Sequence, residues 1–342
     1  MLYFAADGGG TKLQMLAFDE QLHLLGHLRG PAVTTGYIPP DIVRRDVHDT
    51  IQRLIDMLPR PLPLTEDGRL IVDCLYESGV GFGPDRVLPE MAELRRTVFI
   101  SEPPCGLLAG IAEETGILTL SGTGSDEFWI ENGVTKIVAG AYGPILGDEG
   151  SGYDLGRRTL LAAVRADDGR GPATMLRDMV FREYGLKEKM FELVNIVHGS
   201  PDTRKEVARA TYLLGQAARD GDAVARQILT DGGTLLAEDT TAVLRRMGAD
   251  RDCSVPVTVS GGAWKIHPLL WHSYRARLLA DYPKLQVRAP AFDPVMAGVI
   301  RHVLDTVGAV TPETMTQLKA EFTPCVLAGY FEEENRKSGG TP

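Results

Sequence analysis

Two short glycine-rich loops constrain this chain more than any other feature of its sequence. The first, residues 7–11 (DGGGT), lies between apolar segments at 2–6 and 13–18. The second, residues 121–125 (SGTGS), lies at the same place in GILTLSGTGSDEFWIENGVTKIVAG. Each loop is preceded by an apolar strand pattern and followed by the pattern of a β-meander. The recurrence predicts a duplicated fold.

The sequence between and after these loops alternates between strand and helix patterns. Residues 39–58 carry apolar side chains at helical spacing, and 69–77 and 97–100 have strand patterns on either side of a helical 89–96. Mostly helical sequence fills about 151 to 250, before a β segment at 255–262 and further helix. This alternation is typical of an α/β protein.

Composition excludes several classes of protein. The 342 residues, 44% of them hydrophobic, suffice for two domains with substantial cores. A formal charge of −10 argues against nucleic acid as a partner, because phosphate backbones need clustered Lys and Arg. With no apolar run of membrane-spanning length and no secretory signal, we expect a cytoplasmic protein without a membrane partner. The four cysteines form no C-x-x-C pair, so no disulfide framework or metal ribbon is indicated.

Loops without β-carbons let backbone N–H groups approach an anion closely, and a threonine hydroxyl adds a directed donor. Phosphate is the obvious anion. The sequence lacks G-x-x-x-x-G-K-[ST], and no G-x-G-x-x-G joins a strand to a helix, so a P-loop and a dinucleotide fold are both excluded. Two hairpins could instead hold a polyphosphate between them, with Asp7 serving Mg²⁺. Taken singly, either loop is more often a tight hairpin turn.

Five motifs, spread over most of the chain, carry a family resemblance: DGGGTK, LSGTGS, GPILGDEGSGYDLGRR, SGGAW and PAFDPVMAGV. Together they resemble the BadF/BadG/BcrA/BcrD ATPase family, and within it the N-acetylglucosamine kinases. The resemblance implies an α/β fold of two ribonuclease H-like domains of the actin and hexokinase type around a central ATP and sugar cleft. The expected N-terminal domain is 1–115 plus a returning helix in about 301–342. The C-terminal domain, with a helical insertion, is 116–300.

The resemblance also implies roles for the loop residues. Asp7 would serve Mg²⁺, and the adenosine of ATP would lie against the bare backbone of SGGAW. A helix-entry turn before Trp264 is the alternative explanation of that glycine pair. The implied nucleotide contacts are Gly9, Gly10, Thr11, Lys12, Gly122, Thr123, Gly261, Gly262 and Ala263.

The implied acceptor pocket centres on Asp148, which matches a family carboxylate that hydrogen-bonds sugar hydroxyls. Capping of the helix that starts near Ser151 is compatible with that role. The implied substrate contacts are Thr34, Ser125, Asp126, Tyr142, Gly143, Asp148 and Ser151.

The chain departs from the family pattern at the acceptor site. Ser101 and Glu102 occupy the places of an Asn-Asp or Thr-Asp pair whose Asp is the catalytic base, so Glu102 would be the base, kept ionised by the dipole of the helix it begins. Thr34 and Asp126 stand where Asn is usual, and Tyr142 where Trp is common. Replacing an amide by a carboxylate exchanges donors for an acceptor and a charge, which suits a cationic or hydroxyl-rich sugar better than an acetamido group.

These features favour an ATP-dependent kinase that transfers the γ-phosphate to a hydroxyl of an amino sugar, N-acetylglucosamine or glucosamine-like. ATP and Mg²⁺ are the expected cofactors and a small sugar the expected partner, and a homodimer is left open. Two alternatives keep the fold. One is a non-kinase ATPase that drives electron transfer with an iron–sulfur cluster, for which Cys105 is a poor candidate ligand. The other is a sensor that binds nucleotide and sugar through a degenerate acceptor site without turnover.

Overall fold

The computed structural model describes residues 1–34, 38–79 and 81–327, together with Gly329 and Phe331. The chain forms two compact units, described here in turn. Unit 1 comprises Met1–Glu114 and Pro290–Leu327, and unit 2 comprises Thr115–Ala289 with the described residues after 327. The segment that returns to unit 1 thus begins earlier than the expected 301, because the Ala291 N–H donates to the Gly110 carbonyl. The end of the expected range, 332–342, lies outside the described residues.

Unit 1 is built on a five-stranded sheet with the order β3-β2-β1-β5-β7. The first three strands, β1 (Leu2–Gly8), β2 (Leu13–Asp19) and β3 (Leu24–Gly30), form the predicted antiparallel meander. β5 (Cys74–Gly79) and β7 (Thr97–Ile100) extend it on the other side of β1, both parallel to β1. The carboxyl ends of three parallel strands therefore meet at one edge.

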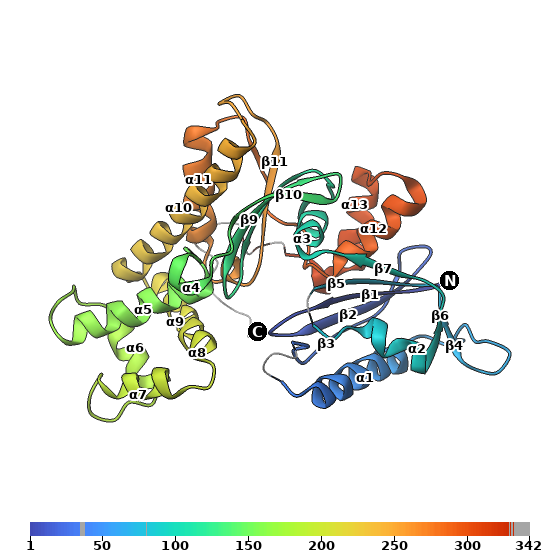
Figure 1. Cartoon of the computed structure of the whole chain (residues 1–342), viewed down its shortest axis with the longest axis horizontal. Coiled ribbons are helices and arrows are strands. Elements are labelled where there is room, and N and C mark those ends of the chain that lie inside the picture. The colour runs from blue at the N-terminus through green and yellow to red at the C-terminus, as the bar shows by residue number, and fades with distance from the viewer. Residues whose placement is uncertain (35–37, 80, 328, 330, 332–342) are drawn as a thin grey trace. The chain divides into compact units, whose positions relative to one another are not determined.

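Helices cover both faces of this sheet (Figure 1). α1 (Pro40–Met57) packs over β2 and β3, whereas α3 (Glu102–Ile111) and α12 (Met296–Val307) pack on the opposite face. Side chains of β1 alternate between the two resulting cores, with Phe4 in the core under α1 and Ala5 in the core under α3 and α12. Burial of both faces explains why the strand is apolar throughout.

Two local predictions in unit 1 are wrong. The expected strand at 69–77 is divided at Asp73, whose carboxylate accepts a hydrogen bond of 2.9 Å from the Leu2 N–H. The expected helix at 89–96 stops at Met91, because the next three residues pair in parallel with the strand before Asp73. The remaining elements of unit 1 are β4 (Leu70–Val72), η1 (Pro84–Arg86), α2 (Leu88–Met91), β6 (Ala92–Leu94), α13 (Pro312–Glu321) and η3 (Thr323–Cys325).

Unit 2 repeats the topology of unit 1, with the order β10-β9-β8-β11-β12. β8 (Gly116–Ser121), β9 (Ser125–Glu131) and β10 (Val134–Gly140) form an antiparallel meander. β11 (Pro256–Ser260) and the short β12 (Gln286–Val287) follow in parallel beside β8. The predicted duplication of the fold is confirmed.

The long helix α10 (Ala223–Arg246) packs across β8, β9 and β10 and lies against α11 (Pro268–Asp281). Most of the residues between β10 and α10 form helices, of which α5 (Gly152–Asp167) is the longest (Figure 1). No helix among the described residues is both long and apolar enough to cross a membrane. The other elements of unit 2 are α4 (Gly143–Leu146), α6 (Leu176–Glu183), α7 (Glu192–Gly199), α8 (Thr203–Arg209), α9 (Thr211–Arg219) and η2 (Ala263–Lys265).

Candidate functional site

In unit 1 the parallel strands bring the predicted metal residue and the predicted base to one sheet edge. Asp7 near the end of β1 pairs in register with Ser78 of β5, and Ser78 pairs with Ile100 at the end of β7. Glu102, an exposed residue, follows two positions later as the first residue of α3. Its carboxylate thus lies at the positive end of a helix, although the side chain of Ser101 makes no capping hydrogen bond.

Asp7 is held in a setting that suits a cation. Burial raises the pKa of its carboxyl above the usual range, and Asp293 raises it further. A hydrogen bond of 3.0 Å from the Ser78 hydroxyl to Oδ1 opposes that shift, as does the charge of Lys12. A bound divalent cation would favour the ionised form, and Mg²⁺ is commonly held by one or two carboxylates plus phosphate oxygens. The donor chemistry at Asp7 therefore fits Mg²⁺. Among the described residues, including those around Asp7, no group of three or more His, Cys, Asp or Glu could hold a metal ion, so Mg²⁺ there would depend on phosphate oxygens.

The turn of the first glycine-rich loop, residues 9–12, is held by two backbone hydrogen bonds of Gly9. The Gly9 N–H donates to the Lys12 carbonyl (3.0 Å), and the Gly9 carbonyl accepts from the Val33 N–H (3.1 Å). The Lys12 ammonium donates to Gln14 Oε1 at 2.6 Å, and Thr11 is exposed. The loop is thus a closed hairpin turn with an exposed tip.

The glycines of the predicted nucleotide loops fall into two kinds. A β-carbon at Gly9, Gly122 or Gly262 would meet nothing within 4 Å, and none of the three has left-handed backbone angles. The chain's own packing does not explain these glycines, and the same holds for Gly199 at the end of α7. Gly261 differs, because its φ is 111° and a β-carbon would lie 2.2 Å from the Ser121 carbonyl oxygen. Gly261 is therefore required by the fold of unit 2.

The segment after Gly261 has the turn that sequence also suggested. Ala263 and Trp264 are buried in η2, which begins directly after Gly262. The helix-entry turn and the bare backbone at Gly262 occur together, so the two explanations of SGGAW are compatible.

Thr34 lies beside the first loop with an unused hydroxyl. Its Oγ1 is buried and has no hydrogen-bond partner in the described part of the chain. A β-carbon at Gly10 would lie 3.7 Å from that oxygen, which is ordinary contact. Buried hydroxyls without partners are rare in folded proteins, so Thr34 is a candidate ligand contact.

The second glycine-rich loop is docked onto the start of α5. The Gly122 N–H donates to the Gly124 carbonyl at 2.8 Å. The carbonyls of Gly122 and Thr123 accept from the N–H groups of Gly152 (2.8 Å) and Tyr153 (3.2 Å). The first turn of the helix thus fixes the loop, as Val33 does for the loop of unit 1.

The Asp148 carboxylate has an ionic partner that sequence analysis missed. It is 3% exposed, and its Oδ2 accepts from Arg204 Nη2 of α8 at 2.7 Å. Its Oδ1 accepts from the Ser125 N–H at 3.3 Å. The cap of α5 is instead Ser151, whose hydroxyl accepts from the Asp154 N–H at 3.2 Å. A β-carbon at Gly124 would lie 2.5 Å from the guanidinium, so a larger residue there would displace the Arg204 side chain.

Asp126 and Asp148 make this part of unit 2 acidic. Burial raises the pKa of Asp126, and the charge of Asp148 raises it further, whereas Arg204 and a hydrogen bond from the Ala141 backbone lower it. Arg204 is thus paired with Asp148 and acts on Asp126 through its charge alone. Such a site favours a hydroxyl-rich or cationic ligand.

Tyr142 and Gly143 lead from β10 toward Asp148. The Tyr142 side chain is 73% exposed, so its ring is free to stack on a ligand. Gly143 has a φ of 75°, a left-handed conformation that favours glycine.

Cys105 is a buried thiol in α3 and does not have the setting of a cluster ligand. Its Sγ donates to the Pro294 carbonyl at 3.3 Å. Burial raises the pKa of the thiol well above its ordinary value, whereas metal ligation needs a thiolate. The cysteine is best explained by packing.

Comparison with known proteins agrees with this description. The chain is 27% identical over 300 residues to the N-acetylmuramic acid/N-acetylglucosamine kinase of Clostridium acetobutylicum, covering 86% of this chain and 95% of that protein. It is 23% identical over 310 residues to the N-acetyl-D-glucosamine kinase of Dictyostelium discoideum, covering 87% and 97% of the two chains.

Solved structures show the fold. A Porphyromonas gingivalis structure matches with a TM-score of 0.63 at 19% identity, covering 89% of this chain and 99% of that one. A ROK family glucokinase from Streptomyces griseus, in complex with glucose and AMPPNP, matches with a TM-score of 0.50 at 16% identity, covering 88% and 97%. The predicted actin/hexokinase-type α/β fold is confirmed. The model of the BadF/BadG/BcrA/BcrD ATPase family matches residues 6–276, and the chain therefore belongs to that family.

Proposed function

We propose that this protein is an ATP-dependent kinase that phosphorylates a hydroxyl group of an amino sugar. The observation that carries the proposal is the pair of hairpin loops whose Gly9 and Gly122 the chain itself does not need. Two relatives that match over most of their length are named as kinases of N-acetylated amino sugars, which supports the same substrate class.

In the proposed reaction the glycine-rich loops offer backbone N–H groups to the phosphates of ATP, and Asp7 would hold Mg²⁺. The metal, when bound, offsets the negative charge on the phosphates. Glu102 accepts the proton of the acceptor hydroxyl while the oxygen forms its bond to the γ-phosphorus. The bond from that phosphorus to the β-γ bridging oxygen breaks, and ADP leaves. Catalysis of this kind is mainly positioning and charge stabilisation.

We expect the acceptor to contact Tyr142 and the acidic pair of Asp126 and Asp148 in unit 2. Thr34 of unit 1 is a separate candidate contact. Arg204 offsets only part of the negative charge of the acidic pair. A free 2-amino group, cationic at neutral pH, gains more from the remaining charge than an uncharged acetamido group does. We therefore expect glucosamine to be accepted at least as well as N-acetylglucosamine.

A sugar panel tests the proposal. ADP release from MgATP is measured with N-acetylglucosamine, glucosamine, N-acetylmuramic acid and glucose, and the sugar phosphate is identified by mass spectrometry. We expect one sugar phosphate for each ADP released. ADP release at the same rate with and without every sugar would contradict the proposal.

Glu102→Gln tests the base. Loss of a positioned acid–base group costs about 10²- to 10⁴-fold in rate, and the affinity for ATP should change little. Glu313→Gln is the matched control, since Glu313 is also an exposed glutamate in the first turn of a helix in unit 1. Equal activity of the two variants would exclude Glu102 as the base.

A further inference from the structure

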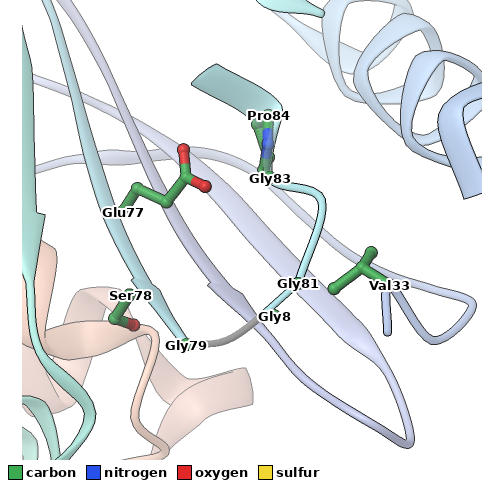
Figure 2. A pocket seen from close by; sticks show the side chains of 8 residues that line it. All are labelled: Gly8, Val33, Glu77, Ser78, Gly79, Gly81, Gly83 and Pro84. Carbon is green, nitrogen blue, oxygen red and sulfur yellow. The ribbon is translucent and has the colours of Figure 1, made fainter. Parts of the chain in front are cut away.

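Unit 1 contains a small pocket on the side of β1 and β5 opposite to Asp7. It is open to solvent, and its free volume of about 20 Å³ has room for a group about the size of one water molecule. Glu77 is the polar side chain directed into it, and most of the rest of its wall is backbone (Figure 2). The side chain of Ser78, the next residue of β5, points to the opposite face, where its hydroxyl donates to Asp7. The lining residues are Gly8, Val33, Glu77, Ser78, Gly79, Gly81, Gly83 and Pro84.

Three glycines of the pocket wall lie close to other groups, and Gly79 and Gly81 are required by backbone packing. A β-carbon at Gly79 would lie 1.8 Å from the Gly8 carbonyl oxygen, and one at Gly81 would lie 2.3 Å from that of Val33. A β-carbon at Gly83 would lie 1.5 Å from Oε1 of Glu77. No side chain could be accommodated at these positions without moving backbone or the carboxyl group. The pocket is therefore narrow and its shape is fixed by close backbone packing.

Glu77 brings a buried carboxyl to this pocket, directed toward Gly83 (Figure 2). Glu77 is only 8% exposed, and its Oε2 accepts a hydrogen bond of 2.9 Å from the Asp85 N–H. Burial raises the pKa of Glu77 to about 8, and the charge of Asp85 and a side-chain hydrogen bond with Asp85 raise it further. The hydrogen bond from the Asp85 N–H and the charge of Arg86 act in the opposite direction. At neutral pH the carboxyl therefore keeps its proton and can donate a hydrogen bond as well as accept one.

The pocket adjoins the residues assigned to the reaction. Its Gly8 follows Asp7, and its Ser78 donates to the Asp7 carboxylate at 3.0 Å. Its Val33 precedes Thr34, whose Cα would lie 3.4 Å from a β-carbon at Gly81. A ligand that uses the unpartnered hydroxyl of Thr34 would thus be close to the pocket mouth.

We propose that the pocket is a subsite for an uncharged hydroxyl group of the acceptor sugar, and that Glu77 determines specificity there. The inference rests on the proposed function and adds a residue and a substituent to it. A hydroxyl fits because it is small enough for a glycine-walled pocket and can both donate to and accept from a neutral carboxyl. Larger or anionic substituents are excluded by the backbone walls and by the absence of a cation among the lining residues.

Deoxy sugars combined with Glu77 variants test this subsite. Monodeoxy analogues of the best acceptor are compared by kcat/KM with wild type, Glu77→Ala and Glu77→Gln. With wild type, one analogue should lose about tenfold or more, because a buried polar group loses its partner. With Glu77→Ala the same analogue should lose less than about twofold, whereas the amide of Glu77→Gln should retain most of the discrimination.

Several readouts separate a specific role from a structural one. Melting temperatures identify a variant that fails to fold, and Glu131→Ala, at an exposed strand glutamate of unit 2, should discriminate as wild type does. Discrimination by wild type should weaken above about pH 8, as the proton of Glu77 is lost, and should stay constant in Glu77→Gln.

Equal penalties for every deoxy analogue in wild type and Glu77→Ala would overturn the subsite while leaving the kinase intact. If wild type transfers phosphate to no sugar, the proposed function fails, and the subsite fails with it.

Discussion

The two units share one topology but use their hairpin loops differently. In unit 1, four residues separate the paired ends of β1 and β2, and the carboxylate of Asp7 precedes the glycines. In unit 2, three residues separate β8 and β9, and the corresponding position is Ser121, whose hydroxyl donates to the Gly150 carbonyl at 3.0 Å. The loop of unit 1 has a carboxylate suited to a metal at Asp7, whereas the side chain of Ser121 at the corresponding position of unit 2 stabilises its own loop.

The polar side chains around the two loops also differ in whether they have hydrogen-bond partners within the chain. In unit 2 the Asp148 carboxylate is bound by Arg204, and the Ser125 hydroxyl donates to the Glu149 carbonyl. In unit 1 the Thr34 hydroxyl has no partner among the described residues, and Glu77 holds a proton at neutral pH. The polar groups around the loop of unit 2 are thus paired within the chain, whereas unit 1 retains groups whose hydrogen bonds a ligand can complete. The repeated fold contains two similar loops, and the side chains around each loop differ.

The largest expected effect comes from substituting Asp7, with the corresponding residue of unit 2, Ser121, substituted for comparison. Asp7→Asn should lower kcat/KM about a hundredfold or more if Asp7 holds Mg²⁺ as proposed, because a bound metal would contribute several kcal/mol of charge stabilisation. Ser121→Ala should mainly lower the free energy of unfolding, by about 1 kcal/mol, since it removes one buried hydrogen bond. Steady-state kinetics and urea unfolding measure both effects. Equal catalytic losses in the two variants would break the distinction between the loops.

Arg204→Gln tests whether unit 2 is preorganised by its ion pair. Removing the guanidinium leaves Asp148 and Asp126 facing each other, so the free energy of unfolding should fall by about 1–3 kcal/mol and the KM for the sugar should rise. The control is Arg209→Gln on the same helix, whose partners Glu183 and Glu206 are more exposed than Asp148. That variant should lose at most about 1 kcal/mol. A larger loss for Arg209→Gln would contradict the assignment.

Glu77→Gln tests the buried carboxyl of unit 1 through stability. The folded-state pKa of about 8 is above the ordinary value, so the proton-bound form contributes stability at low pH that is lost as pH rises through 8. The glutamine variant has no such loss. Relative to wild type it should gain roughly 3–4 kcal/mol between pH 5 and pH 8.5, measured by urea unfolding, because each unit of pKa shift is worth about 1.4 kcal/mol. A difference that does not change with pH would show that Glu77 is ionised throughout.

Local patterns were sufficient to predict much of the fold. The apolar spacing of the meanders and of α1, and the recurrence of the glycine-rich loops, are properties of neighbouring residues. Predictions failed where tertiary pairing decided the outcome. The residues at 92–94 have helical composition, but their backbone pairs with a strand more than twenty residues earlier.

The site was predictable only in part for the same reason. The loops and Asp148 lie in motifs, whereas Arg204 is 56 residues from its partner, in a helix with no motif of its own. Glu77 carried a signal that was available, since a glutamate within the apolar stretch CLYESG is unusual for a buried strand. Its glycine neighbours at 79, 81 and 83 were a second signal, because such spacing indicates close approach of backbone.

The central claim is that Gly9 and Gly122 lack a β-carbon so that the phosphates of a nucleotide can approach the backbone. Gly9→Ala, Gly122→Ala and the control Gly199→Ala are equally open in the structure, because a β-carbon meets nothing within 4 Å at any of the three positions. All three variants should therefore melt as wild type does. Isothermal titration calorimetry with MgATP should show about a tenfold or larger loss of affinity for the first two and none for Gly199→Ala. Wild-type affinity in all three would contradict the account.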